Sequence, residues 1–183
     1  RPNATLAAPD GVTRDGIAFF EAARAHGLLG IVAKETDSKY LPGERSRAWL
    51  SVMARKQGEF VIGGYTYGGR WNPRSARPRH EAFSSLLIGR VRKDDRLDYA
   101  GEVAGGFQEA TAALASTLNE ATTTDCPFAE APTLERLVFW CRPEVVATIG
   151  YAEQLAGGLL RFPVFRALRP DVPANACRAE GGE

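Results

Sequence analysis

Histidine, cysteine and lysine are scarce in this chain of 183 residues, and each shortage narrows the possible functions. The two histidines, His26 and His80, are isolated, so they form no catalytic constellation with Ser38 or Ser46. The three cysteines, at positions 126, 141 and 177, have the spacing of neither a disulfide framework nor a metal site, which favours a reducing, intracellular location. No apolar run approaches the roughly 20 residues of a membrane helix, and no secretory signal is visible, so no membrane partner is expected.

Charge is present in ordinary amount but is unevenly distributed. Residues 41–93 contain eleven Lys/Arg against three Glu, a net charge of +8, whereas residues 94–183 contain seven Arg against fourteen Asp/Glu, a net charge of −7. Such asymmetry indicates one surface suited to a polyanion, although a solvated basic loop would give the same pattern. Only four lysines occur, at positions 34, 39, 56 and 93, against nineteen arginines.

Hydrophobic periodicity predicts a small αβ unit followed by a mainly β region. A helix is expected over 15–26, ended by Gly27, with a strand over 28–34, and Arg55 to Gly58 is expected to be a polar joint. Beyond it the pattern predicts strands over 60–66, 83–91, 97–103, 136–141, 145–151 and 159–168, the last broken at Pro163, and a helix over 108–121. This order of strands and helix is typical of a five-stranded oligonucleotide/oligosaccharide-binding (OB) Greek-key barrel with one inter-strand helix.

The stretch from Gly27 to Met53 resembles the last motifs of the nucleotidyltransferase core of ATP-dependent DNA ligases, especially the bacterial end-joining type. Gly30-Ile31-Val32-Ala33-Lys34, then Asp37-Ser38 with Tyr40, Pro42-Gly43 and Arg45-Ser46, and finally Trp49-Leu50, carry the resemblance. Trp140-x-Arg142-Pro143-Glu144 and Leu160-Arg161-Phe162-Pro163 are similar to the barrel of the same family. The resemblance implies a remnant of the adenylation domain over residues 1–54 and an OB-fold DNA-binding domain over residues 55–183.

The resemblance also shows which charged residues are missing. None of the four lysines begins the family's Lys-x-Asp-Gly motif, so its adenylated nucleophile is absent from this chain. Leu29 replaces the metal-binding glutamate, Ser51 and Met53 replace two phosphate-facing lysines, and Val172 replaces the last lysine of Arg-x-Asp-Lys. Of the residues that the resemblance assigns to nucleotide binding, Lys34 and Arg169 remain. The sequence therefore predicts no catalytic residues and no bound metal.

The function expected from these features is non-catalytic binding of duplex DNA, at nicks or ends, in DNA repair and recombination. The DNA-binding residues predicted from the sequence are Arg45, Arg70, Arg74, Arg77, Arg79, Arg90, Arg92 and Lys93. Trp71 suits stacking on a base or sugar as well as it suits packing on the barrel.

Two other functions stay open at this point. In the first alternative, the chain is the C-terminal part of an active ligase whose adenylated lysine lies elsewhere, and ATP and magnesium are then its cofactors. It is otherwise an interaction module for a repair protein or a homodimer, with residues 1–54 as the docking surface. A cytoplasmic location at the bacterial nucleoid is expected in each case.

Overall fold

The computed structural model describes residues 11–67, 83–107 and 110–178. Contacts within the chain divide it into two compact units, Arg1–Ala54 and Arg55–Glu183, which are called unit 1 and unit 2 below. None of the helices in the described ranges is long and apolar enough to cross a membrane.

Unit 1 consists of one helix and one antiparallel pair of strands. Helix α1 (Gly16–Ala25) ends just before Gly27, whose φ of +72° is the left-handed conformation that closes many helices, and the predicted helix is confirmed. Strands β1 (Gly30–Lys34) and β2 (Trp49–Met53) pair so that Lys34 lies opposite Trp49, Val32 opposite Ser51 and Gly30 opposite Met53. Within residues 11–54, Ala23 alone is fully buried, so this unit has little interior of its own.

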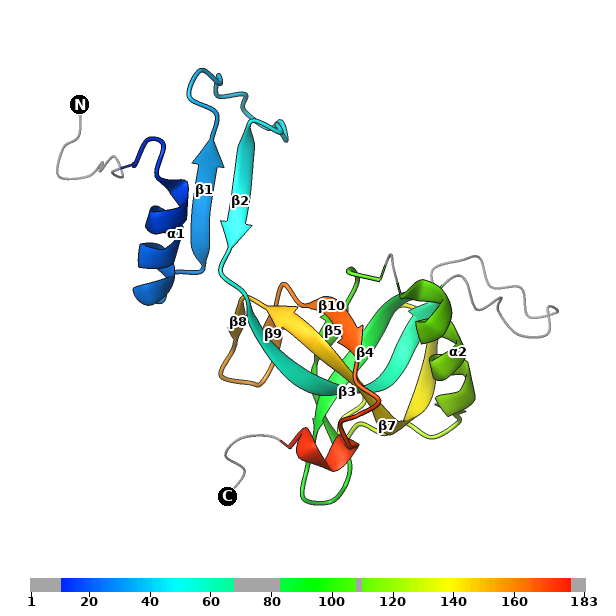
Figure 1. The fold of residues 1–183 in the computed structure, drawn as a ribbon. Helices are drawn as coiled ribbons and strands as arrows, with labels where there is room; N and C mark the ends of the chain where they lie inside the picture. The colour runs from blue at the N-terminus through cyan, green and yellow to red at the C-terminus, as the bar shows by residue number, and fades with distance from the viewer. Residues whose placement is uncertain (1–10, 68–82, 108–109, 179–183) are drawn as a thin grey trace. The chain divides into compact units, whose positions relative to one another are not determined.

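Unit 2 is built on one antiparallel sheet in the order β10-β7-β3-β4-β5 (Figure 1). Its long strands are β3 (Lys56–Tyr67), β4 (Phe83–Val91), β5 (Leu97–Val103), β7 (Val138–Tyr151) and β10 (Val164–Leu168). The smaller elements are helix α2 (Thr111–Ala121), strands β6 (Thr122–Thr123), β8 (Glu153–Gln154) and β9 (Leu160–Arg161), and the 3₁₀ helix η2 (Ala174–Ala176).

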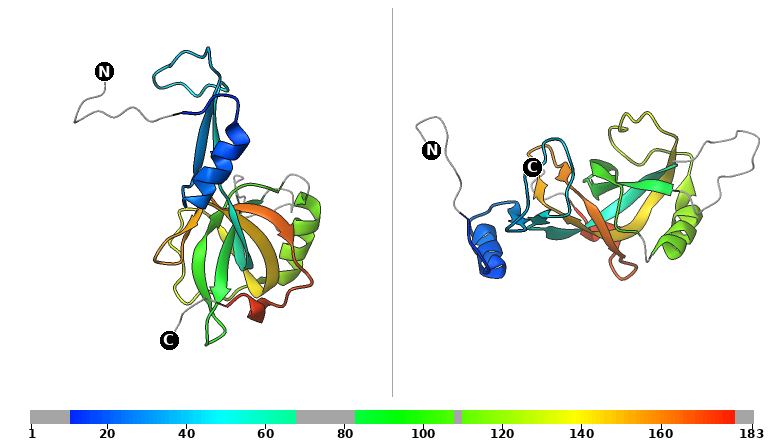
Figure 2. Two further views of the ribbon diagram at one scale, coloured as in Figure 1. Left: turned by 60° about the vertical axis from the view of Figure 1, so that its left-hand side comes forward. Right: turned by 90° about the horizontal axis from the view of Figure 1, so that it is seen from above.

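The two ends of this sheet meet, which closes the barrel. The Phe165 N–H at the start of β10 donates to the Gly105 carbonyl oxygen just past β5, at 2.9 Å. The next residue, Gly106, has φ +96°, and a Cβ there would collide with the Phe165 carbonyl oxygen. Five strands closed in this order, with α2 between the third and fourth long strands, are the OB-fold predicted from the sequence. Figure 2 shows the barrel and α2 from two further directions.

Two apolar clusters hold the barrel together. Inside it, Phe60, Ile62, Leu86, Ile88 and Phe165 pack with Leu114 and Leu118 of α2. On the outer side of β3 and β4, Val61 and Leu87 are covered by Phe128, which comes from the segment between β6 and β7. Burial raises the pKa of Cys141 to about 12, so its thiol stays protonated and structural.

Two sequence predictions need correction. The expected joint Arg55 to Gly58 is wrong beyond Arg55, because Lys56 already pairs with Tyr151 and opens the 12-residue strand β3. The two strands expected on either side of Pro143 form one strand, β7. Pro143 is tolerated because pairing between β3 and β7 shifts register there, so its missing N–H breaks no ladder bond. The predicted helix over 108–121 is described from Thr111 onward.

Candidate nucleic-acid interface

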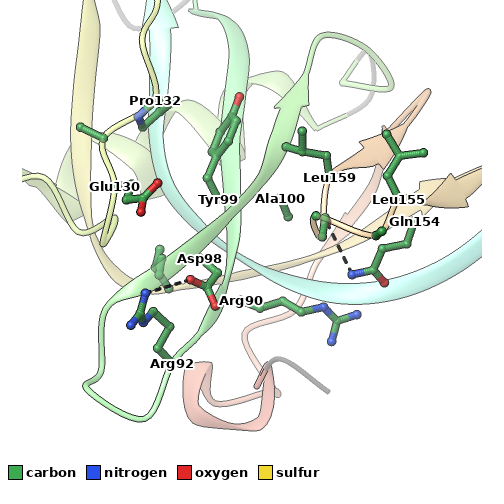
Figure 3. A pocket seen from close by; sticks show the side chains of 15 residues that line it. Arg90, Arg92, Asp98, Tyr99, Ala100, Glu130, Pro132, Gln154, Leu155 and Leu159 are labelled. Carbon is green, nitrogen blue, oxygen red and sulfur yellow. Dashed lines mark hydrogen bonds and ion pairs between the residues drawn. The ribbon is translucent and has the colours of Figure 1, made fainter. Parts of the chain in front are cut away.

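A groove of about 840 Å³ lies on the outer face of unit 2, along the second and third long strands of the barrel. Its floor is formed by β4 and β5, and its walls by residues 130–132 and by the β8–β9 hairpin, residues 154–159 (Figure 3). In OB-folds the face of strands 2 and 3, with the loop between strands 4 and 5, is where oligonucleotides bind. The groove therefore lies where this fold holds nucleic acid.

Arg90, on β4, lines this groove and forms no ion pair with a carboxylate among the described residues. Its guanidinium lies 4.5 Å from the centre of the Phe60 ring, and its Nη1 donates to the Arg178 carbonyl oxygen at 3.2 Å. Its Nε is buried and has no hydrogen-bond partner within the described ranges. A partly desolvated guanidinium without a counter-ion favours an anionic ligand such as a phosphate.

Arg92, two residues further along β4, is already neutralised by its own hairpin. Its guanidinium forms ion pairs of 3.3 Å with both Asp94 and Asp98. Figure 3 shows its side chain directed at Asp98, away from Arg90. Lys93, in the same turn, is exposed to solvent. Glu130 also lines the groove. The charged lining therefore consists of two arginines, 90 and 92, and two carboxylates, Asp98 and Glu130, and the groove alone is not strongly basic.

A neutral hydrogen-bond donor completes the groove. Burial, reinforced by the nearby Glu102 carboxylate, raises the pKa of Tyr99 to about 12, so its phenol keeps its proton at neutral pH. The Tyr99 ring packs edge-on against Phe128, with ring centres 5.5 Å apart.

A second group of cations lies where β3 begins, and the sequence reasoning did not include it. It consists of Arg55, Lys56, Arg161 and Arg166, called the β3–β10 basic cluster below. The Arg55 guanidinium donates to the Phe162 carbonyl oxygen at 2.7 Å, and Lys56 pairs with Tyr151. Arg161 forms an ion pair with Glu153 at 3.3 Å, and Arg166 crosses over Gly150.

Of this cluster, Lys56 lies on the same face of the sheet as Arg90. A Cβ on Gly58 would lie 3.6 Å from the Arg90 Nη2 and 3.7 Å from the Tyr151 ring, so both side chains cover the same side of Gly58. Lys56 pairs with Tyr151 across the two strands. Arg166 lies over Gly150, whose side faces away from that of Tyr151 along β7, so the β3–β10 basic cluster has members on both faces of the sheet.

Phe162, whose carbonyl oxygen accepts the hydrogen bond from Arg55, is an exposed aromatic residue of the chain segment between β9 and β10. The side chain is 56% exposed, and its φ of +51° is unusual for a bulky residue. Backbone strain of this kind is common at binding sites, and phenylalanine wedges are used by proteins that open a base step from the minor groove. The signal in the sequence is two arginines, 161 and 166, flanking Phe162 and Phe165, and the structure shows that Phe162 is the exposed one.

Arg169, which the sequence assigns to nucleotide binding, is held by two carboxylates. Its Nη1 lies 2.9 Å from Glu59, and its Nε and Nη2 lie 2.9 and 2.8 Å from the two oxygens of Asp171. The bidentate contact with Arg169 lowers the pKa of Asp171 to about 2. Arg169 is therefore fixed in direction and locally neutralised.

Unit 1 brings the former nucleotide-binding positions onto one face of the β1–β2 pair. Alternation along the strands places Val32, Lys34, Ser51 and Met53 on that face, where Lys34 is the only charge. The Lys34 Nζ lies 4.2 Å from the centre of the Trp49 ring, and the Trp49 Nε1 donates to Ser38 Oγ at 3.0 Å. Leu29, just before β1, offers no oxygen to a metal ion. On these two strands, the side chains able to contact a phosphate on this face are therefore Lys34 and Ser51.

The other predicted DNA-binding residues have different outcomes. Arg45 lies exposed in the loop between β1 and β2. Arg70, Arg74, Arg77 and Arg79, together with Trp71, lie outside the described residues. Their assignment stays a prediction.

Comparison with known proteins places this geometry in a family. The family "ATP dependent DNA ligase C terminal region" matches residues 79–172. The multifunctional non-homologous end joining protein LigD of Mycolicibacterium smegmatis is 34% identical over 169 residues, which are 91% of this chain and 21% of that protein. LigD of Pseudomonas aeruginosa is 34% identical over 159 residues, 84% of this chain and 18% of that protein. The chain thus spans about a fifth of the length of these relatives.

Solved structures give the same result. The ligase domain of Mycobacterium tuberculosis LigD superposes with a TM-score of 0.61 at 30% identity, covering 96% of this chain and 55% of that one. A mycobacterial DNA ligase D complexed with ATP and MES gives a TM-score of 0.57 at 31% identity, with the same coverage. The match of sequence, barrel and strand order leads to one conclusion. This chain belongs to the ATP-dependent DNA ligase family, of which it contains the C-terminal region.

Proposed function

We propose that this chain is a non-catalytic module that binds duplex DNA at nicks or ends in a DNA ligase-related repair process. The observation that carries the proposal is Arg90, which lines the groove of an OB barrel without a carboxylate partner among the described residues. Lysine and arginine contacts to phosphates supply most of the sequence-independent affinity of DNA-binding proteins. The predicted basic residues at 70, 74, 77 and 79 would extend the same surface.

Loss of the ligation chemistry is the second part of the proposal. Transfer of AMP needs a lysine nucleophile, a metal held by oxygen ligands and fixed cations at the phosphates. Among the residues of β1 and β2 on the corresponding face, Lys34 is the one charge, and its ammonium group is already in contact with Trp49. Arg169 is occupied by Glu59 and Asp171. ATP and magnesium are therefore not expected to bind productively to this chain.

An active ligase is the alternative, favoured by one observation. The match to the ligase domain of M. tuberculosis LigD continues through unit 1 and covers 96% of this chain, but 55% of that domain. A nucleophilic lysine from the part of a ligase domain that has no counterpart here would then supply the chemistry. In a bacterial cell either role would place the protein in the cytoplasm at the nucleoid.

Two measurements on the purified chain test the proposal. Binding to nicked and intact duplexes of one sequence is titrated across a range of salt concentrations. Separately, the chain is incubated with labelled ATP and magnesium and denatured. Binding that weakens steeply with salt, without covalent label, supports the proposal. Covalent label on the protein contradicts the loss of chemistry, with Lys34 the first residue to examine, and absence of binding contradicts the DNA-binding role.

A further inference from the structure

The charges in the groove of unit 2 can bind one phosphate but not a row of phosphates. Of the four charged side chains that line the groove, Arg92 and Asp98 form an ion pair with each other. Arg90 remains to bind a phosphate, and the Glu130 carboxylate would repel a second phosphate. A surface that follows a DNA backbone needs several cations in succession. The rest of the groove therefore suits the uncharged parts of nucleotides, the bases and sugars.

The size of the groove fits a single strand better than a duplex. Residues 130–132 form one wall and the β8–β9 hairpin forms the other (Figure 3), and the enclosed volume is about 840 Å³. Pockets of about 300–1,000 Å³ enclose molecules of drug size, and a nucleotide is a molecule of that size. Bases in a duplex are stacked and paired, so a base has to be unpaired before it can lie between two protein walls.

Tyr99 supplies uncharged hydrogen-bonding groups to the groove. Its raised pKa keeps the hydroxyl protonated, and this hydroxyl has no hydrogen-bond partner within the described ranges. The Leu97 N–H donates to the Pro127 carbonyl oxygen, and the Ala129 N–H donates to the Leu97 carbonyl oxygen, both at 2.9 Å. Leu97 thus turns its backbone groups away from β4. Alternate residues of a strand face the same edge, so the N–H and C=O groups of Tyr99 also point away from β4. These groups match the donors and acceptors on the edge of a base.

Apolar side chains line both walls beside Tyr99. Leu155 and Leu159, in the β8–β9 hairpin, are 43% and 41% exposed, and Pro132 belongs to the opposite wall. Figure 3 shows Tyr99 between Pro132 and Leu159. Proteins that bind an unpaired base hold it between apolar or aromatic side chains and contact its edge with hydrogen bonds. The groove offers both kinds of contact.

We propose that this groove binds unpaired nucleotides that extend from the end of a duplex, as in a short overhang or a frayed end. Arg90 binds the phosphate at which the duplex ends. The bases that follow lie between the two apolar walls, with their edges at the hydroxyl and backbone groups of Tyr99. The inference rests on the proposed DNA binding and specifies which part of a DNA end the barrel recognises.

Fluorescence anisotropy with three forms of one labelled duplex tests the inference. The first form has blunt ends, the second carries an overhang of three nucleotides, and the third carries the same overhang with abasic sites, which keeps the phosphates and removes the bases. Overhangs of both polarities are used. The overhang with bases should lower the Kd about fivefold or more relative to the blunt form, and the abasic overhang should not. Because bases supply this gain, the ratio of the two Kd values should stay constant as the salt concentration rises.

Variants of the groove locate the gain. Leu155→Ala with Leu159→Ala removes one apolar wall and should bring the ratio of the blunt and overhang Kd values close to one. Tyr99→Phe removes the hydroxyl, keeps the ring that packs on Phe128, and should lose part of the gain. Leu137→Ala is the matched control, since Leu137 is 38% exposed on the same unit and does not line the groove. Thermal unfolding shows whether each variant keeps the barrel.

The outcomes separate this inference from the proposed function. Equal binding of blunt and overhang duplexes overturns the inference and leaves the proposed duplex binding in place. An abasic overhang that binds as tightly as one with bases, or a gain that the double leucine variant retains, also overturns it. Absence of binding to all three forms contradicts the proposed function itself, and the inference with it.

Discussion

Replacing Arg90 by alanine should weaken DNA binding far more than replacing Arg92, although both side chains line one groove two residues apart on β4. Arg90 has no carboxylate partner within the described ranges, while Arg92 has Asp94 and Asp98 at 3.3 Å. A hydrogen bond to a charged group contributes about 1.5–3 kcal/mol, so Arg90→Ala should raise the Kd roughly 10- to 150-fold. Arg92 must break two ion pairs to bind phosphate, and Arg92→Ala should change the Kd by less than about threefold.

Fluorescence anisotropy with a labelled nicked duplex, repeated at several salt concentrations, measures both variants. Losing one phosphate contact should also make the plot of log binding constant against log salt concentration less steep by about 0.9. A loss of folding would not produce this change. Thermal unfolding of each variant provides the control, because Arg90 also packs on Phe60. Equal losses for the two variants, or an unchanged salt slope for Arg90→Ala, would refute the assignment of Arg90 to a phosphate.

Three further outcomes follow from the geometry of the barrel. Gly106→Ala should lower the free energy of unfolding in urea by about 2 kcal/mol or more, because φ is +96° and the new Cβ meets the Phe165 carbonyl oxygen. Phe162→Ala should weaken binding to nicked duplex by about 1–3 kcal/mol and change the free energy of unfolding by less than about 0.5 kcal/mol. If the binding free energy and the unfolding free energy change by the same amount, the role of Phe162 is structural. Asp171→Asn should destabilise the barrel at neutral pH. The pKa of Asp171 is lowered to about 2, so the carboxylate stabilises the folded state at pH values above its unfolded pKa of about 3.9, and this stabilisation disappears as the pH falls through 2. Thermal melts at pH 7 and pH 2 measure the difference in melting temperature between wild type and Asp171→Asn. A difference that is the same at both pH values would contradict the assigned cause.

The sequence predicted the barrel because its strands carry strong local signals. Strands β4 and β5 were placed with their observed limits, since Lys93 to Arg96 form a tight polar turn between two apolar runs. Prediction failed where the register between distant strands decides the outcome. Lys56 belongs to β3 because Tyr151, 95 positions later, pairs with it, and Pro143 stays inside β7 because a bulge opposite it removes the need for its N–H.

The candidate site was harder to predict, because counting charges does not reveal which charges are already paired. Arg90 and Arg92 look equivalent in the sequence, and only the hairpin geometry shows that Asp94 and Asp98 occupy Arg92. The β3–β10 basic cluster joins Arg55 to residues more than a hundred positions later, through the Phe162 carbonyl oxygen. No local pattern carries that information, and the basic block at 41–93 contains Arg55 and Lys56 but neither Arg161 nor Arg166.

The residues that the resemblance assigns to phosphate chemistry differ in whether they are already in contact with a neighbour. Leu29, Ser51, Met53 and Val172 stand where the resemblance implies charged residues, and the two cations that remain have local partners. Lys34 lies over Trp49, and Arg169 is bound by Glu59 and Asp171. A phosphate that binds Lys34 must compete with the Trp49 ring, and one that binds Arg169 must compete with two carboxylates. Arg90 has no such competitor among the described residues, and for this reason the proposed phosphate contact is assigned to Arg90.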